Sequence, residues 1–165
     1  VVGNFDSSGA PDGLPTVRHP VEKDDTDAML AIREGLKAGC TDFVIYGALD
    51  GDRLDHTIAN LQTLQFLADH GATGYLAGNT YMAMVIKNAG VRFSAEATGI
   101  LSVFCMGADA TGVTIRGTKY GLENGTLSAG FPLGVSNHFV GKEASVSVEN
   151  GTLIVMYDIE KGLYE

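Results

Sequence analysis

The hydrophobic periodicity of the chain changes near residue 90, and no other sequence feature constrains its fold as strongly. Before this point, short apolar runs typical of strands alternate with segments of helical period. After it the helical period is lost, and short strand-like runs follow one another. We therefore expect a Rossmann-like parallel α/β domain over residues 1–89, followed by an antiparallel β-sandwich domain over residues 90–165, with an open barrel as the alternative for this second half.

The first half predicts two helices and three strands, besides the end of a buried strand at Val1–Gly3. Asp24 and Asp25 are candidate N-caps for a helix that ends near Ala38, before Gly39. A second helix is expected from Asp55 to His70, ended by Gly71. Expected on the apolar faces are Ala28, Ala31, Ile32 and Leu36 in the first helix, and Ile58, Leu61, Leu64 and Ala68 in the second. Strands are expected at Phe43–Tyr46 (covered on both faces), Tyr75–Ala77 and Met82–Ile86.

The second half predicts four strands, namely Ile100–Phe104, Val113–Ile115, Ala144–Val148 and Leu153–Tyr157. Two nearly identical Asn-Gly segments, Glu123–Thr126 and Glu149–Thr152, are typical of two-residue hairpin turns.

Composition excludes several classes of partner. The formal net charge of −9 argues against nucleic acid and anionic membranes, which bind basic surfaces. No apolar stretch is long enough to span a membrane, and the start does not resemble a secretory leader. Cys40 and Cys105 lack metal-type spacing, and they predict two buried free thiols in the cytoplasm.

Two acidic segments precede or begin helices in the first half. In Gly3–Ser8, Asp6 can present a carboxylate to a metal and Ser7 can bind a phosphate oxygen, although an ordinary turn is favoured for this segment alone. Glu22–Asp27 places four carboxylates and Lys23 within six positions. Helix capping alone and capping together with metal binding remain equally open.

A third polar segment, Gly47–His56, lies between a predicted strand and a predicted helix. Its glycines permit close approach of a ligand, and a helix start favours an anion. Arg53 suits phosphate oxygens, and Asp55 and His56 can bind metal or substrate or exchange protons. No Walker A motif is present, and His56 alone is more often structural. The polar turn Gly134–Phe139 is by itself an ordinary loop.

Together and in this order, these segments resemble the signature of thiamine pyrophosphokinases. Gly3–Ser7 resembles the family's Gly-Asp-x-Asp-Ser loop, and Lys23–Asp27 its Lys-Asp-x-Thr-Asp segment. Gly51–His56 with Asn60 resembles its Gly-x-Arg-x-Asp-His element. Gly117–Tyr120 and Gly134–Asn137 resemble two motifs of its β-domain.

The resemblance implies a homodimer with shared active sites that converts ATP and thiamine into AMP and thiamine diphosphate with Mg²⁺. Asp55 would accept a hydrogen bond from the attacking hydroxyl, and we expect Asp6, Asp27 and Asp55 to converge on one cation. The implied roles are metal ligation by Asn4, Asp6 and Asp27; catalysis by Asp27, Arg53 and Asp55; nucleotide binding by Ser7, Lys23, Asp24, Thr26, His56 and Asn60; and thiamine binding by Tyr120, Ser136 and Asn137.

Three departures accompany the resemblance. Asn4 stands where the family usually has Asp, Asp52 stands where a second Gly is usual, and the family's N-terminal strand and Asp-Gly-Gly loop have no counterpart. We therefore expect either an upstream segment that supplies this loop or a chain with impaired activity. Alternative readings are a Mg²⁺-dependent kinase or hydrolase with another substrate, a non-catalytic thiamine-binding fragment, and a structural domain whose aspartates only cap and solvate.

Overall fold

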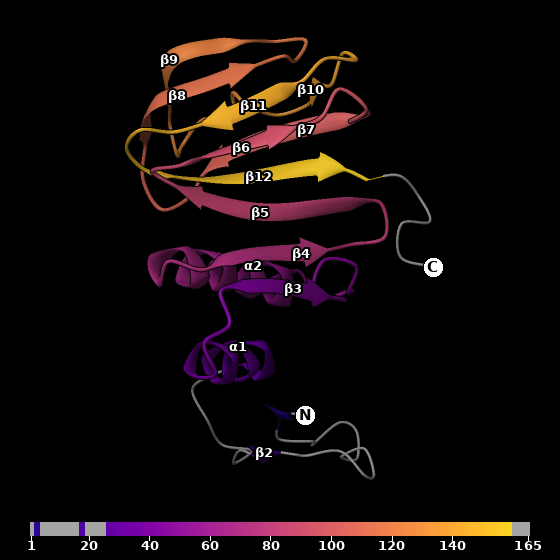
Figure 1. Cartoon of the computed structure of the whole chain (residues 1–165), viewed down its shortest axis with the longest axis vertical. Coiled ribbons are helices and arrows are strands. Elements are labelled where there is room, and N and C mark those ends of the chain that lie inside the picture. The colour runs from indigo at the N-terminus through magenta and orange to yellow at the C-terminus, as the bar shows by residue number, and fades with distance from the viewer. Residues whose placement is uncertain (1, 4–16, 19–25, 160–165) are drawn as a thin grey trace. The chain divides into compact units, whose positions relative to one another are not determined.

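The computed structural model describes residues 2–3, 17–18 and 26–159, in two compact units that divide between Phe43 and Val44. In the first unit, β1 (Val2–Gly3) and β2 (Val17–Arg18) pair in parallel, and α1 spans Asp27–Lys37. The second unit contains two sheets and α2 (Leu54–Asp69) (Figure 1).

The first helix begins at Thr26, whose Oγ1 accepts a hydrogen bond from the backbone N of Met29 at 3.2 Å. The predicted caps, Asp24 and Asp25, lie outside the described residues. The predicted end is confirmed, because Gly39 has a φ of +85°.

The predicted apolar face of α1 is partly wrong. Leu30 and Ile32 are its buried residues, whereas Ala31 is exposed. Leu30 and Ile32 lie about 200° apart around the helix, so α1 is buried on two sides rather than along one stripe.

The six-stranded sheet has the order β10-β7-β12-β5-β4-β3. The second sheet has four strands in the order β6-β11-β8-β9. The strands are β3 (Asp42–Tyr46), β4 (Thr73–Ala77), β5 (Tyr81–Lys87), β6 (Gly90–Phe93), β7 (Ile100–Cys105), β8 (Ala110–Arg116), β9 (Leu122–Leu127), β10 (Asn137–His138), β11 (Ala144–Ser147) and β12 (Thr152–Asp158).

The predicted parallel sheet is wrong for the larger part of the six-stranded sheet. Strand β5 pairs antiparallel with β4 and β12, and β7 pairs antiparallel with β12 and β10. The connection from β4 to β5, residues 78–80, is too short for the crossover that parallel neighbours require. Within the six-stranded sheet, only β3, α2 and β4 keep the predicted strand–helix–strand order, and Figure 1 draws β3 and β4 as arrows in the same direction.

Strand β3 lies at the edge of this sheet. The prediction that both of its faces are covered is wrong. The side chains of Val44 and Tyr46 are 50% and 63% exposed. The apolar run therefore predicts the strand correctly but not its burial.

The second helix matches the prediction within one residue at each end, and Gly71, with a φ of +71°, follows it. Leu64 and Leu67 are buried and face Gly74 of β4, where a Cβ atom would lie 2.8 Å from Leu64 Cδ2 and 2.6 Å from Leu67 Cδ1. Ile58, which we placed on the apolar face, is 52% exposed. Helix α2 is therefore anchored near its C-terminal end, while its first turns remain accessible.

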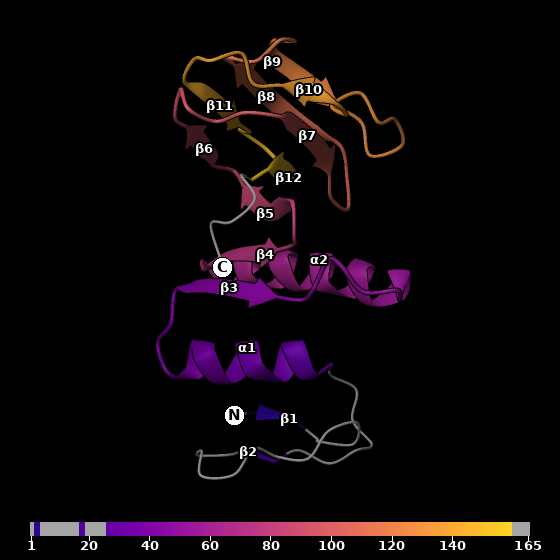
Figure 2. The same ribbon diagram turned by 90° about the vertical axis from the view of Figure 1, so that its right-hand side faces the viewer.

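The core of the second unit lies between the two sheets. Its buried side chains come from strands of both sheets: Met84, Ile86, Leu101, Val103, Leu153 and Val155 from the first, and Ala110, Val113, Ile115, Leu127, Ala144 and Val146 from the second. The antiparallel pairing predicted for the second half is found. Figure 2 shows strands of the two sheets, such as β7 and β8, next to one another. The division between residues 89 and 90 stays a prediction, and the six-stranded sheet includes strands from both sides of it.

Neither Asn-Gly segment forms the predicted two-residue hairpin. Asn124 and Gly125 lie inside β9, where Asn124 has a φ of 48° and the register with β8 is irregular. Asn150 and Gly151 connect β11 to β12, which belong to different sheets. Positive φ at these pairs serves a strand irregularity and a sheet-to-sheet connection, because the partner strands lie elsewhere.

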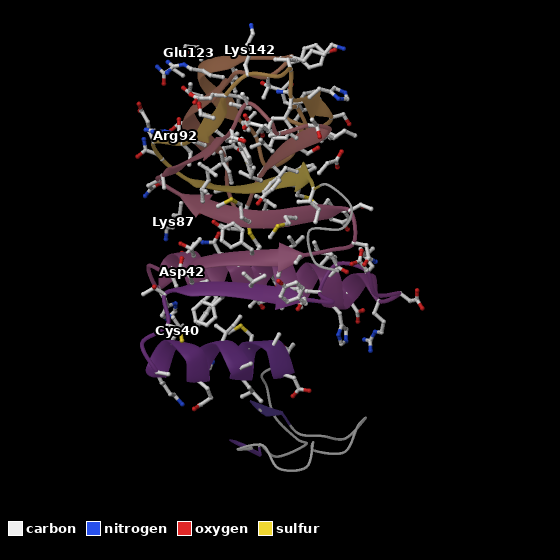
Figure 3. All side chains as sticks on the ribbon, turned by 45° about the vertical axis from the view of Figure 1, so that its right-hand side comes forward. Cys40, Asp42, Lys87, Arg92, Glu123 and Lys142 are labelled. Carbon is white, nitrogen blue, oxygen red and sulfur yellow. The ribbon has the colours of Figure 1, made fainter. Side chains whose placement is uncertain are left out.

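Both cysteines are free, as predicted, but Cys40 is exposed and Cys105 only partly buried. Cys40 is labelled in Figure 3. The same figure labels Lys87 of β5, whose Nζ forms an ion pair with Asp69 of α2 at 2.6 Å. Within the described part of the chain, neither helix is long and apolar enough to cross a membrane.

Candidate functional site

Five predicted site residues lie outside the described residues, so their roles stay predictions: Asn4, Asp6, Ser7, Lys23 and Asp24. Thr26 and Asp27 are described at the start of α1, and both are exposed. The hydroxyl oxygen of Thr26 caps the helix, which is the role its position requires irrespective of a nucleotide. The predicted convergence of Asp6, Asp27 and Asp55 also stays a prediction.

The loop of residues 47–53 follows the carboxyl end of β3 and leads into α2. It turns at Gly47, which has a φ of +70°, and then buries Ala48 and Leu49 at 7% and 6% exposure. Asn60, on the second turn of α2, donates from Nδ2 to the carbonyl oxygen of Ala48 at 3.0 Å. The nucleotide contact predicted for Asn60 stays untested, and its observed contact fixes the loop to the helix.

Arg53 and Asp55 meet at the N-terminus of α2, as their spacing in the motif implies. Arg53 donates to both carboxylate oxygens of Asp55, from Nε to Oδ1 at 3.1 Å and from Nη2 to Oδ2 at 2.5 Å. The hydrogen bond from Arg53 holds the pKa of Asp55 below its ordinary value, and the backbone N of His56 adds a second hydrogen bond. The same contact raises the pKa of Arg53.

This pair suits the binding of a charged phosphate ester. The two side chains are 66% and 65% exposed, so an incoming anion can reach the guanidinium of Arg53. The first backbone N–H groups of α2 point in the same direction as the helix dipole and favour negative charge. Because Asp55 stays ionised at neutral pH, it can accept a hydrogen bond from a hydroxyl group.

In the second half, Asn137 connects the two motifs that resemble the family's β-domain. It is 5% exposed, and its Oδ1 accepts hydrogen bonds from the backbone N of Tyr120 and His138, both at 2.9 Å. Its Nδ2 donates to Thr118 Oγ1 at 3.0 Å and to the carbonyl oxygen of Tyr120 at 2.6 Å. All four hydrogen-bonding positions of the amide are therefore occupied by the protein itself.

Ser136 and Tyr120 lie next to Asn137 and are exposed. Ser136 has a φ of 58°, and its backbone N donates to Ser102 Oγ at 3.1 Å. The Nζ of Lys119 lies 5.2 Å from the centre of the Tyr120 ring. The predicted thiamine residues thus form one local group, in which Asn137 holds the backbone and the two exposed side chains can meet a ligand.

Sequence reasoning did not single out Asp50 or Thr118. Both use side-chain oxygens to fix candidate loops, Asp50 through the backbone N of Asn79 and Thr118 through Asn137. Nothing in the sequence marks such contacts, because their partners lie far along the chain.

The described residues contain no cluster of three or more His, Cys, Asp or Glu side chains that could hold a metal ion. The predicted ligands Asn4 and Asp6 lie outside the described residues. A metal site therefore stays a prediction.

Comparisons with solved structures agree on one fold. The chain resembles thiamine pyrophosphokinase from Bacillus subtilis with a TM-score of 0.84 at 23% identity, covering 96% of this chain and 78% of that chain. It also resembles a thiamin pyrophosphokinase family protein from Enterococcus faecalis, with a TM-score of 0.73 and 26% identity over 89% of this chain and 70% of that one. Yeast thiamin pyrophosphokinase gives a TM-score of 0.59 and 18% identity, over 70% of this chain and 39% of that chain.

No curated protein sequence matches the chain. Two family models do match it. The catalytic domain of thiamin pyrophosphokinase matches residues 1–76, and the vitamin B1 binding domain matches residues 91–153. They follow the order of the motifs described above, and together they extend over most of the sequence. The chain therefore belongs to the thiamine pyrophosphokinase family.

Proposed function

We propose that this chain transfers the pyrophosphoryl group of ATP to the hydroxyl of thiamine, giving AMP and thiamine diphosphate. The observation that carries this proposal is the presence of both family domains, catalytic over residues 1–76 and vitamin B1 binding over residues 91–153, in one chain. A thiamine-binding module alone would account for the second match but not for the first.

The reaction requires a primary alcohol to attack the β-phosphorus of ATP while AMP leaves. Positioning and neutralisation of charge dominate such transfers. Arg53, at the start of α2, would bind phosphate oxygens of the nucleotide. It would give up one of its two hydrogen bonds to Asp55 to do so. Asp55 would then be released to accept the hydrogen bond of the thiamine hydroxyl.

Mg²⁺ is part of the proposal, with Asp6 and Asp27 as ligands and the amide oxygen of Asn4 as a weaker one. Bound to the triphosphate, the ion would draw negative charge away from the reacting phosphorus. Lys23, Asp24, Thr26 and Ser7 would surround the phosphates, and His56 the nucleotide.

Thiamine would bind at the group formed by Tyr120, Ser136 and Asn137. In this arrangement Ser136 and Tyr120 supply exposed contacts, and Asn137 keeps the two backbone segments together. We further propose that the enzyme acts in the cytoplasm as a homodimer with shared sites, so that the thiamine group of one protomer serves the catalytic loops of its partner.

The test is incubation of the full chain with ATP, Mg²⁺ and thiamine, with AMP and thiamine diphosphate measured together. We expect both products in equal amounts, and Arg53→Ala should lower kcat/KM by about 100-fold or more, as for the loss of a charged contact to the transferred group. Arg116→Ala is the control matched for exposure and charge, because Arg116 forms an equally exposed pair with Glu123 on β8 and β9 rather than at the N-terminus of α2.

Absence of both products would refute the proposal. Thiamine binding without ATP turnover would favour a non-catalytic binding protein, and AMP formation with another alcohol in place of thiamine would favour a related kinase. Full activity of Arg53→Ala, as in the control Arg116→Ala, would show that Arg53 does not belong to the site.

A further inference from the structure

The loop of residues 47–53 is attached to the sheet at a second point, through Asp50. Asp50 Oδ2 accepts a hydrogen bond from the backbone N of Asn79 at 2.9 Å. Asn79 lies in the turn between β4 and β5, so this contact joins segments 29 residues apart. Figure 1 shows the carboxyl end of β3 and the β4–β5 turn on the same side of the six-stranded sheet.

The turn that receives Asp50 is itself fixed from other sides. Gly78 donates its backbone N to the carbonyl oxygen of Tyr81 at 3.0 Å, and Ile159, beyond β12, donates to the carbonyl oxygen of Thr80 at 3.0 Å. The turn therefore provides a rigid partner for the carboxylate, because it is hydrogen-bonded within itself and to the C-terminal end of β12.

Asp50 is exposed, but its carboxylate lies close to Gly78 of the turn. A Cβ atom built on Gly78 would lie 3.3 Å from each carboxylate oxygen of Asp50 and 3.1 Å from the carbonyl oxygen of Tyr81. A glycine at position 78 allows the carboxylate to reach the turn at this distance. Asp50 belongs to no cluster of metal-ligating side chains within the described part of the chain. Its contacts are those of a structural acceptor.

The consequence concerns Arg53 and Asp55. The loop is held at Ala48 by Asn60 and at Asp50 by the β4–β5 turn, and Arg53 follows three residues later. Arg53 is the N-cap of α2, and its side chain makes no capping hydrogen bond, so the loop before it contributes to the position of the helix start together with Asp55. Losing the contact of Asp50 would free the loop between Ala48 and the helix.

We infer that Asp50 is a positioning residue, which fixes the loop of residues 47–53 on the β4–β5 turn and thereby sets the Arg53–Asp55 pair for its reaction with the nucleotide. This inference rests on the proposed function for its catalytic consequence, while the attachment itself can be measured without the reaction. It assigns Asp50 a hydrogen-bonding role that requires an acceptor oxygen and no negative charge.

The experiment compares Asp50→Ala, Asp50→Asn and Asp52→Ala with the unaltered chain. Asp50→Ala should lower kcat/KM for ATP about 10-fold with KM for thiamine unchanged, because the loss lies on the nucleotide side. Asp50→Asn keeps an acceptor oxygen and should stay within about 3-fold of the unaltered chain. Asp52→Ala removes the same charge from an exposed position of the same loop and should lower kcat/KM less than Asp50→Ala.

Hydrogen exchange of the backbone amides supplies the second readout. Asp50→Ala should speed exchange at Asn79 and at the amides of residues 47–53, whereas exchange in β12 should not change. Unchanged exchange in this variant would overturn the attachment whether or not the chain is active. If the unaltered chain forms no AMP, the proposed function fails, and the exchange data still decide the attachment.

Two kinetic results would overturn the positioning role in an active enzyme. One is full activity of Asp50→Ala. The other is an equal loss in Asp50→Asn and Asp50→Ala that is restored by raising Mg²⁺, since this pattern identifies a metal ligand rather than a hydrogen-bond acceptor.

Discussion

Replacement of Asn137 by alanine tests how the thiamine group is built. The variant loses four hydrogen bonds at a side chain that is 5% exposed, and it leaves the backbone N of Tyr120 and His138 without their acceptor. Each bond contributes a net ~0.5–1.5 kcal/mol. Because Tyr120 is exposed and part of the freed backbone can bind water, we expect the free energy of unfolding to fall by about 2–4 kcal/mol.

A loss of this size is a large share of the stability of an ordinary domain, about 5–15 kcal/mol. It corresponds to a decrease in Tm of roughly 5–15 °C for a chain of this length. Thermal unfolding followed by circular dichroism, with urea unfolding for the free energy, measures both quantities.

The control is Ser136→Ala at the neighbouring position. Ser136 donates to Ser102 from its backbone N, so truncation of its side chain should change the free energy of unfolding by less than about 0.5 kcal/mol. The reasoning is refuted if Asn137→Ala has the same Tm as the unaltered chain and differs from it only by a higher KM for thiamine. That result would show that Asn137 contacts the substrate and that its internal hydrogen bonds contribute little.

Three further outcomes are expected. Gly117→Ala should lower the free energy of unfolding by more than about 3 kcal/mol in urea, because its φ is +73° and its Cβ would overlap the carbonyl oxygen of Glu143. Gly141→Ala, at a φ of +68° in open space, should lower it by only about 1 kcal/mol. Equal losses in the two variants would contradict this. Cys40 should react with iodoacetamide before Cys105, because Cys40 is exposed and burial raises the pKa of Cys105. Peptide mapping of the labelled sites measures the order, and earlier labelling of Cys105 would contradict this prediction. Hydrogen bonds, chiefly the one from Lys87, hold the pKa of Asp69 below its ordinary value of 3.8. The stability that they contribute is present above pH 3.8 and is lost as the pH falls through the lower pKa of the folded state. In acid titrations of the free energy of unfolding, Asp69→Asn should therefore lose less stability than the unaltered chain, by under about 1 kcal/mol.

Local signals predicted the helices and strands well and their assembly poorly. Gly39 and Gly71 end the helices where the sequence places them, because a left-handed residue after a helix is a local requirement. The sequence does not show that β5 pairs with β12, since that pairing joins residues about 70 apart and depends on the whole sheet. A parallel sheet was inferred from strand–helix alternation, which in the described second unit holds only for β3, α2 and β4.

The same distinction applies to the candidate site. The contact of Arg53 with Asp55 follows from a motif within one helix start, and it is found. The prediction gave Asn137 a contact with thiamine, yet its amide is filled by partners 17 and 19 residues away. A motif residue can thus be required for the arrangement of a site without touching the ligand, and the sequence alone does not separate these two reasons.

Asn60, Asp50 and Asn137 act in the same physical way. Each places a side-chain oxygen or amide against a backbone group of a loop that carries exposed polar residues: Asn60 against Ala48, Asp50 against Asn79, and Asn137 against Tyr120. Arg53 and Ser136 occupy exposed positions of their loops, so hydrogen bonds from neighbouring elements help to fix these loops. Variants at these three positions should therefore lose activity through loop geometry, and conservative replacements that keep the hydrogen bond should restore it. Loss of activity in a variant that retains the hydrogen bond would instead place that residue in contact with substrate.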